Sequence, residues 1–493
     1  MQSMLTFEKI VPEKAGVPTD CIQRLTKRLA EKQIPMHSLL LARQDKLFFE
    51  GYYAPCTADM PHRMFSVSKS FTAVAVFFLA AEGRLSLDDT IVSWFPEKLP
   101  QKVHPWIASM TIRDMLMMRS CHAATTYKAD MTSDWVESYF TTPPTHPAGT
   151  LFHYDTSAPH TLCALVEKLT GIDMLDYLKE KLSPLALSAG SYLLKDPFGV
   201  SMGGTGLVAL PMDLLKFGFF LLRRGNVCGK QLLPASYLDM AVSNLSATCV
   251  TAPLPSEAQG YGMQFWRGEK NNYVCYGMGG QFIIIFPDYE LICVTTADTQ
   301  SIAGGNQQIY DALYEEILPA IGNTPLPETP ETGQLLSRTL ASLRLAPLPQ
   351  TALSADIKKT ARRVNGKTFY VQNTPSAFER FSLQFDSEET ASGSPAGGTL
   401  SFVLKNQTCT VVFGIGQLRT GSFPLYHLNY AADGAWLSDG TFYIKAHIID
   451  SYVGCVQFQL AFEGNSLTVF LRKKEESLFQ EFNGHLYCTC DMP

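Results

Sequence analysis

The chain has 493 residues, of which 46% are hydrophobic and 17% charged, and its formal net charge is -6. This length predicts two or three domains with sizeable cores. The 40 basic residues form no basic run and are outnumbered by 46 acidic ones, so nucleic acid is not expected as a partner. The longest apolar run, residues 71–81, is about half of what a bilayer requires, so no membrane span is expected.

The twelve cysteines are scattered along the chain, and only Cys488 and Cys490 lie close together. Without a C-x-x-C pair a zinc ribbon is not supported, and the ten histidines have no metal-ligand spacing. We therefore expect neither a metal nor another cofactor. The amino terminus does not have the pattern of a signal peptide. Many thiols without an export signal indicate a reducing compartment, and we predict a cytoplasmic protein.

The first half of the chain combines two strands with a series of helices. An amphipathic helix is predicted for residues 19–33, with Asp20 near its start, and a β-hairpin for residues 38–42 and 46–53. Further helices are predicted where apolar periodicity is bounded by cap or breaker residues: after Ser66, and over residues 110–119, 157–169, 174–182 and 211–224.

In residues 261–297 the apolar residues recur with the period that is typical of strands. The candidates are residues 261–267, 272–276, 281–286 and 291–296, and a helix over residues 307–321 follows. Strands from the two ends of this region must pair in one antiparallel sheet, with helices as its cover and as an inserted lobe. Residues 1–324 are therefore expected to form an α/β domain of the α+β kind.

A second domain is predicted after a linker over residues 325–359, which is rich in Pro, Thr and Ser and holds a short helix at residues 333–343. Residues 360–493 are expected to form an all-β barrel or sandwich. Its short strands are predicted at residues 369–371, 381–385, 399–405, 408–413, 442–449, 456–462 and 467–471, with turns at residues 433–434, 438–440 and 464–465 and a loop over residues 388–398.

The first motif with chemical meaning is Ser66-x-x-Lys69, at the start of a long apolar helix. Residues three apart share a helix face, so the Ser66 hydroxyl and the Lys69 amine can meet. The unpaired N–H groups of a first helical turn also carry a partial positive field. A serine there, beside an amine, is a candidate nucleophile. The alternative is an ordinary helix cap with a solvated Lys69.

Two further motifs could surround such a nucleophile. Tyr154 precedes a helix start and could carry a proton, although it could equally be a half-buried aromatic residue beside the cap residues 155–157. Met278, Gly279, Gly280 and Gln281 lead into a buried strand, where glycines let a ligand approach the backbone. The alternative for these glycines is a bulge or a tight turn.

Other residues resemble functional motifs only superficially. Residues 199–203 match the G-x-S-x-G pattern, but the strand before Ser201 and the helix after it are missing, so Ser201 is not expected to be the nucleophile. His153 and His62 could line a pocket, but a structural or rim position is expected for both.

The three motifs in this order resemble the serine β-lactamase and penicillin-binding-protein superfamily, most closely its class C β-lactamase-like group of esterases, D-aminopeptidases and D-stereospecific amidases. Sequences similar to those of this group are found in residues 65–73, 83–89, 111–116 and 203–207, the last followed by Asp213-Leu214. The resemblance covers residues 7–321 and does not reach the C-terminal β domain. It implies an antiparallel sheet flanked by helices, with a helical lobe and the active site between them.

The resemblance also implies roles for single residues. Ser66 would be acylated, and Lys69 and Tyr154 would share the work of general base and acid. The backbone N–H groups of Ser66 and Gln281 would form the oxyanion hole. Free lysine and tyrosine have pKa values near ~10, so a base that acts at neutral pH needs a pKa lowered by ~3, or ~4 kcal/mol. We assign the base to the Lys69–Tyr154 pair.

Two positions depart from the family's pattern. Thr156 stands where the family often has Asn, and Met278 stands where Lys or His commonly begins the third motif. A missing cation argues against strong β-lactam binding and for a neutral ester or amide. Thr156, Met278, Gly279 and Gly280 are the predicted substrate-binding residues.

We therefore predict a serine hydrolase that cleaves an ester or amide, including peptide or β-lactam-like bonds, through an acyl-enzyme on Ser66. The alternative is a catalytically weak or inactive penicillin-binding-like scaffold that acts as a binding protein. The expected partner is a small-molecule ester, amide or peptide substrate, and a homo-oligomer is left open.

Overall fold

The computed structural model describes residues 4–252, 254–372, 376–387 and 395–490. The chain divides into two compact units. Unit one comprises residues 1–53 and 57–343, and unit two comprises residues 54–56 and 344–493. Of the linker predicted over residues 325–359, α11 (Pro330–Ser342) falls in unit one, whereas α12 (Ala355–Val364) begins within unit two.

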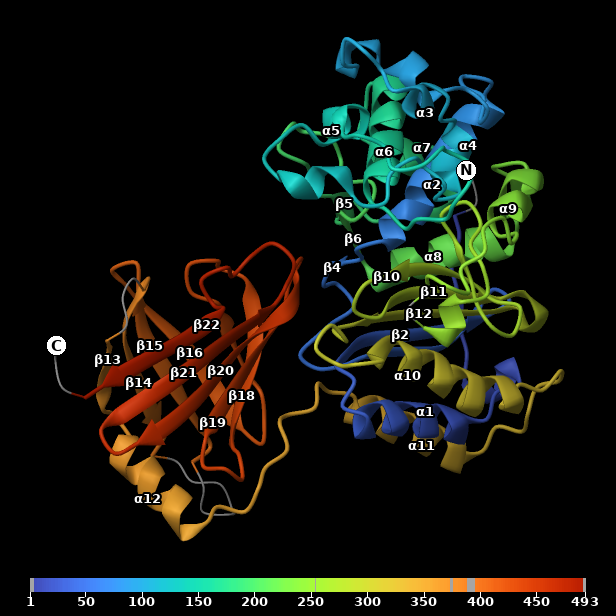
Figure 1. The fold of residues 1–493 in the computed structure, drawn as a ribbon. Coiled ribbons are helices and arrows are strands. Elements are labelled where there is room, and N and C mark those ends of the chain that lie inside the picture. Colours follow the sequence, from blue (N-terminus) through green and yellow to red (C-terminus); the bar gives the residue numbers. More distant parts are fainter. Residues whose placement is uncertain (1–3, 253, 373–375, 388–394, 491–493) are drawn as a thin grey trace. The chain divides into compact units, whose positions relative to one another are not determined.

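A seven-stranded sheet forms the centre of unit one, in the order β1-β3-β2-β12-β11-β10-β9 (Figure 1). Strand β2 pairs antiparallel with β12, with Leu291 opposite Arg43, so strands far apart in the sequence lie side by side as predicted. Only β1 runs parallel to its neighbour β3. The strands are β1 (Glu8–Lys9), β2 (Met36–Arg43), β3 (Lys46–Tyr52), β9 (Trp266–Arg267), β10 (Tyr273–Gly277), β11 (Gln281–Phe286) and β12 (Leu291–Ala297).

Helices cover both faces of this sheet (Figure 1). On one face lies α8 (Pro211–Leu222), whose Gly218 allows a close approach because a Cβ atom there would lie 2.8 Å from both Ile283 and Ile292. The other face is covered by α1 (Thr19–Glu31), α10 (Gly305–Ala312) and α11.

A helical lobe is inserted between the two halves of the sheet, and its apolar side chains join the core between α8 and the sheet. The central helix, α2 (Val67–Ala81), packs against α6, α7 and β10. The other helices of the lobe are α3 (Pro105–Ala108), α4 (Ile112–Leu116), α5 (Trp135–Thr141), α6 (Ser157–Thr170) and α7 (Met174–Lys181), and α9 (Ala235–Ala241) follows α8. Short strands β4 (His62–Arg63), β5 (Tyr192–Leu193) and β6 (Leu207–Ala209) form a separate small sheet, and β7 (Asn226–Val227) pairs with β8 (Lys230–Gln231).

Two predicted elements of unit one are shorter than expected, each because of left-handed backbone. The helix predicted over residues 110–119 is limited to α4, since Thr111 and Asp114 form a capping box at its start and Met118 has φ +54° just beyond its end. The strand predicted over residues 261–267 is limited to β9, because Gln264 has φ +68° and interrupts the extended chain.

Unit two is a closed nine-stranded barrel. Of the two predicted architectures, barrel and sandwich, the barrel is therefore the one present. Its closure comes from β16, which pairs in parallel with β18 through Gly414 opposite Asp433 and Ile415 opposite Gly434. The tenth strand, β17, pairs with β18 outside this ring. The strands are β13 (Thr368–Val371), β14 (Phe378–Phe385), β15 (Gly397–Leu404), β16 (Gln407–Ile415), β17 (Arg419–Ser422), β18 (Asn429–Trp436), β19 (Phe442–Ile449), β20 (Val453–Glu463), β21 (Ser466–Lys474) and β22 (Gly484–Thr489).

The turn predicted at Asp433-Gly434 is wrong, because both residues lie inside β18. A Cβ atom on Gly434 would lie 2.7 Å from the Phe442 ring and 3.0 Å from the Phe413 ring, so the glycine makes room for aromatic side chains in the barrel. Of the loop predicted over residues 388–398, residues 388–394 lie outside the described residues, and Gly397-Gly398 begin β15.

This crowding predicts that Gly434→Val destabilises unit two by about 1–3 kcal/mol, because the added side chain overpacks the barrel. Chemical unfolding followed by aromatic fluorescence would measure the change. Thr410→Val, on an exposed position of β16, is the matched control and should leave stability within about 0.5 kcal/mol of the wild type. Equal effects of the two substitutions would contradict the packing role of Gly434.

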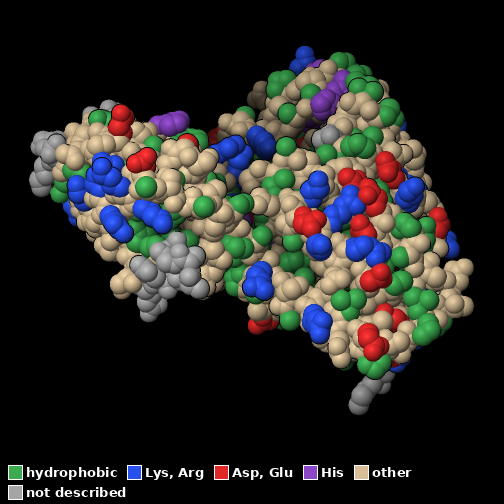
Figure 2. Space-filling view, turned by 90° about the horizontal axis from the view of Figure 1, so that it is seen from below, with side chains coloured by type: hydrophobic (Ala, Val, Ile, Leu, Met, Phe, Trp, Pro, Cys, Tyr) green, Lys and Arg blue, Asp and Glu red, His purple; other side chains and the backbone are tan. Residues whose placement is uncertain are grey.

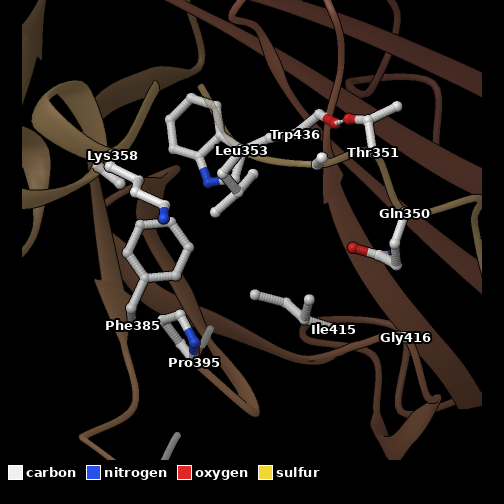
Figure 3. Close-up of a pocket in the computed structure, with 11 residues that line it drawn as sticks. Gln350, Thr351, Leu353, Lys358, Phe385, Pro395, Ile415, Gly416 and Trp436 are labelled. Carbon is white, nitrogen blue, oxygen red and sulfur yellow. Dashed lines mark hydrogen bonds between the residues drawn. The ribbon is translucent and has the colours of Figure 1, made fainter. Parts of the chain in front are cut away.

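A cavity of about 600 Å³ lies at the end of the barrel next to α12 (Figure 3). Its walls are mostly apolar and include Leu353, Phe385, Ile415 and Trp436. Lys358 of α12 extends its amine toward this space.

Exposed ion pairs connect α1 to the helical turns that follow α10: Arg24 pairs with Glu316 and Arg28 with Glu315. Figure 2 shows that basic and acidic side chains are interspersed on the face seen from below. Because exposed pairs contribute little, α1 is held mainly by its apolar face, including Ile22 and Leu25. Within the described residues, no helix has the length and apolarity needed to cross a membrane.

Candidate active site

Ser66 lies at the N-cap position of α2, where the chain enters the helix from a strained turn. The preceding residue, Phe65, is buried and has φ +46°, a left-handed conformation that costs free energy for any side chain except glycine. The Met64 N–H donates to the Leu207 carbonyl at 2.7 Å, and Phe65 forms a bridge with Gly206. These contacts fix the position of the Ser66 hydroxyl.

The Lys69 amine lies directly beside Ser66, as the helical spacing predicted. Lys69 Nζ is 2.9 Å from Ser66 Oγ and 2.7 Å from the carbonyl oxygen of Gly204, to which it donates. It also lies 3.3 Å from Thr156 Oγ1. Only 1% of the Lys69 surface is exposed, so the amine is held inside the protein and is not solvated as the alternative of a simple cap would require.

Tyr154 completes this group of side chains. Its ring lies 5.0 Å from Lys69 Nζ, within cation–π distance. Burial raises the pKa of the Tyr154 phenol well above its ordinary value, and interaction with the Ser66 hydroxyl opposes this effect in part. Tyr154 is therefore a neutral phenol near neutral pH, which can donate a proton more readily than it can accept one.

Thr156 and a glycine loop form the wall behind Lys69. Thr156 precedes α6, and its N–H donates to Thr125 Oγ1 at 3.0 Å. A Cβ atom on Gly204 would lie 2.5 Å from Thr156 Cγ2, so only glycine lets this loop bring its carbonyl oxygen to Lys69. Thr156 therefore lies in the predicted site and contacts the lysine.

The third motif occupies the turn between β10 and β11. Gly279 and Gly280 have φ +86° and +89°, so they provide the left-handed residues of a tight hairpin, which is the structural alternative considered for them. A Cβ atom on Gly280 would lie 2.9 Å from Ile309 of α10. Met278 is 36% exposed, and it lines a shallow hollow with Gly279 and residues 299–306.

The end of β10 approaches the chain just before Ser66. A Cβ atom on Gly277 would lie 2.2 Å from the Met64 carbonyl oxygen, two residues before Ser66. Gln281 lies on β11, which is paired with β10 on one side and β12 on the other. Its side chain is bonded to the backbone of Ala297, at 2.6 and 3.2 Å.

Comparisons with known proteins identify the family of the chain. The beta-lactamase family profile matches residues 22–313, which is more than half of the chain. The chain belongs to the beta-lactamase family. A 6-aminohexanoate-dimer hydrolase from Paenarthrobacter ureafaciens is 23% identical over 281 residues, which make up 52% of this chain and 71% of that protein. The protein is accordingly a hydrolase.

A solved structure shows the same fold over about two thirds of this chain. A proposed 6-aminohexanoate-dimer hydrolase from Bacillus anthracis superposes with a TM-score of 0.53 at 20% identity, covering 66% of this chain and 90% of that one. An octameric penicillin-binding protein homologue from Pyrococcus abyssi has a TM-score of 0.48 at 15% identity, covering 95% of this chain and 99% of that one.

A cavity of about 420 Å³ opens beside Tyr154 in this beta-lactamase-family hydrolase. Its lining consists of aromatic rings and a few polar groups, namely Phe152, His153, Tyr154, Thr251, Glu257, Trp266 and Tyr276. Glu257 was missed in the sequence, because a single glutamate in the Pro- and Ser-containing segment 253–258 carries no periodicity or motif. His153 lies on the lining, as was considered for it.

The Glu257 carboxyl is buried, and this raises its pKa to about 8 from an ordinary 4.5. In the unfolded chain the Glu257 carboxyl loses its proton near pH 4.5, whereas in the folded protein the same carboxyl keeps its proton up to about pH 8. The folded state therefore loses stability as the pH rises from 4.5 to 8, by at most about 1.4 kcal/mol per pH unit.

Glu257→Gln should remove this dependence, because the amide does not titrate. We expect the melting temperature of the variant to rise relative to that of the wild type between pH 5 and pH 8, measured by calorimetry at constant ionic strength. Glu315→Gln on the surface is the matched control. A difference in melting temperature between wild type and Glu257→Gln that stays constant with pH would contradict the raised pKa.

Other residues considered in the sequence lie apart from this group. Ser201 is buried in a loop, where its hydroxyl accepts a hydrogen bond from Lys195 at 3.0 Å. His62 is buried on β4, 2.6 Å from His37, and burial lowers its pKa to about 4. Within the described residues, no three His, Cys, Asp or Glu side chains gather in a way that could hold a metal.

Proposed function

We propose that the protein is a serine hydrolase that cleaves an ester or amide through an acyl-enzyme on Ser66. The observation that carries this proposal is the contact of 2.9 Å between Lys69 Nζ and Ser66 Oγ inside a buried site, with the Tyr154 ring against the same amine. A nucleophile in hydrogen-bond reach of a base, and the base oriented by further groups, is the arrangement that covalent catalysis requires.

In this mechanism the Lys69 amine of the Lys69–Tyr154 pair accepts the Ser66 hydroxyl proton as the oxygen attacks the carbonyl carbon. The Gly204 carbonyl and Thr156 hold the amine in line with Ser66 Oγ. When the tetrahedral intermediate collapses, the neutral Tyr154 phenol gives its proton to the leaving group, and the Lys69 ammonium returns a proton to Tyr154. Water then attacks the acyl-enzyme by the reverse proton path and releases the acid.

For the oxyanion hole we keep the Ser66 N–H at the first turn of α2 and the Gln281 N–H at the start of β11. Gln281 stands opposite Gly277 in the β10–β11 register, and Gly277 approaches the chain just before Ser66. This proximity supports Gln281 as the second donor. Each such donor contributes about 10²–10³ in rate.

The substrate is proposed to be a small ester, amide or peptide with a neutral group near Met278. The name of the relative from Paenarthrobacter ureafaciens supports an amide for this chain as well. The rival proposal, a catalytically weak scaffold that acts as a binding protein, is favoured by Met278, which provides no cation at the start of the third motif. A homo-oligomer and a cytoplasmic location stay predictions. Within the described residues, the twelve cysteines form no disulfide.

A fluorophosphonate probe with mass spectrometry tests the nucleophile directly. We expect one modified residue, Ser66, and loss of labelling in Ser66→Ala. Ser201→Ala is the matched control, because Ser201 is also buried beside a lysine, and it should be labelled like the wild type. No labelling of Ser66 at any pH between 6 and 10 would contradict the proposed acyl-enzyme on Ser66.

A further inference from the structure

Glu257 is a buried acidic group in the cavity beside Tyr154, and the proposed mechanism does not use it. It ends the short helical turn Pro255–Glu257, and only 1% of its surface is exposed. Neither of its carboxyl oxygens has a hydrogen-bond partner among the described residues. Burying a carboxyl without a partner lowers stability, so the fold itself does not explain this residue.

Aromatic rings surround the same space. Tyr154 and Trp266 have ring centroids 5.3 Å apart, and Trp266 and Tyr276 have centroids 6.1 Å apart. The Tyr276 hydroxyl accepts a hydrogen bond from Asn306 at 3.2 Å, which fixes that ring. Faces of aromatic rings attract cations, and the attraction is larger where water is excluded.

Two basic residues, His153 and Lys69, lie near this cavity. His153 lies on the lining, and the Lys69 amine lies against the Tyr154 ring while it is held by Ser66, Thr156 and Gly204. Glu257 is therefore available to a ligand. An unpaired carboxyl among aromatic rings has the chemistry that recognises an ammonium group, because it offers both a counter-charge and ring faces.

We propose that the Glu257 pocket, defined by Phe152, Tyr154, Glu257, Trp266 and Tyr276, binds a protonated amine of the substrate. The hydrolase would then act on esters or amides that carry an ammonium group. This inference rests on the proposed function, since it names the substrate class of the same site.

Binding has a proton balance that can be measured. A substrate ammonium that enters next to the protonated Glu257 carboxyl forms an ion pair, and the carboxyl proton is released to solvent. Binding of an alkylammonium ion near neutral pH should therefore release up to one proton, whereas binding of an alcohol of the same length releases none.

The kinetic test compares two series of p-nitroanilides with the same acyl length, one ending in an ammonium group and the other in a methyl group. At the acyl-chain length that is cleaved best, kcat/KM should be higher for the substrate ending in an ammonium group than for the one ending in a methyl group. Glu257→Gln should lower the ratio of the two kcat/KM values roughly 10- to 100-fold. Glu315→Gln should keep the wild-type ratio. A ratio that does not change in Glu257→Gln would overturn the proposal.

A binding test separates failure of this inference from failure of the proposed function. Titration calorimetry of Ser66→Ala with n-hexylammonium and with 1-hexanol, in buffers of different ionisation enthalpy, needs no turnover. We expect the ammonium to bind more tightly and to release a proton, and both effects to be lost in the double variant with Glu257→Gln. If the ammonium binds while Ser66 is never labelled, the pocket stands and the serine mechanism fails. Equal binding of amine and alcohol overturns the pocket, whatever the labelling result.

Discussion

Lys69→Met is expected to lower kcat/KM by about 10²–10⁴ while the protein stays folded. The amine is the group closest to the Ser66 hydroxyl, and the loss of a positioned general base has this magnitude. Methionine has similar length and suits a buried position, so the fold should tolerate it. Hydrolysis of p-nitrophenyl acetate, together with the melting temperature, would measure both effects.

The chain offers a matched control in a second lysine–serine contact. Lys195 Nζ donates to Ser201 Oγ at 3.0 Å, almost the distance found at Ser66, but Tyr154 and α2 are absent from its contacts. Lys195→Met should therefore keep the wild-type kcat/KM. If Lys69→Met kept activity within threefold of the wild type, Lys69 could not be the base and the proton path would have to run through Tyr154 alone.

Gly277→Ala is expected to lower activity by about 10²–10³ and to lower the melting temperature as well. The added methyl group would lie 2.2 Å from the Met64 carbonyl oxygen, so β10 or the turn that carries Ser66 must move. Either movement displaces Gln281, the proposed second oxyanion donor opposite Gly277, relative to Ser66. The rate of acylation by a fluorophosphonate measures the effect before any deacylation step.

Gly333→Ala, on α11, is the control, because a Cβ atom there would have no heavy atom within 4 Å. It should leave activity unchanged and raise stability slightly, since alanine favours a helix. A Gly277→Ala variant with both the activity and the melting temperature of the wild type would show that the end of β10 does not fix the position of Ser66.

The fold was predictable where the hydrophobic period was long and its ends were marked. Helix α6 ends at Gly171, which has φ +78°, and β11 has the bounds that its apolar run predicts. Closure of the barrel was not predictable, because it depends on strand β18, whose Asp433-Gly434 pair has the composition of a turn. The glycine is there to fit the Phe442 ring, and this contact lies between residues of different strands.

In the candidate site, contacts within one helix could be predicted from the sequence, whereas contacts between distant segments could not. Ser66 and Lys69 are three residues apart on one helix, so their contact follows from local geometry. The partners that come from distant loops, such as Gly204 and Glu257, depend on how the chain returns to α2, which no local pattern records. The oxyanion role expected for Gln281 rests on the resemblance of a short glycine motif, and it stays a prediction.

The left-handed turn at Phe65 has a consequence for variation at that position. Glycine or asparagine would adopt the φ of +46° at position 65 with a smaller cost in conformational free energy. Selection of random variants for thermal stability is therefore expected to enrich these two residues at position 65. Either residue would also remove a buried ring that packs just before Ser66 and would give the nucleophile more freedom. Thermal stability and turnover rate therefore favour different residues at position 65. A substitution there that raises thermal stability is expected to lower the turnover rate.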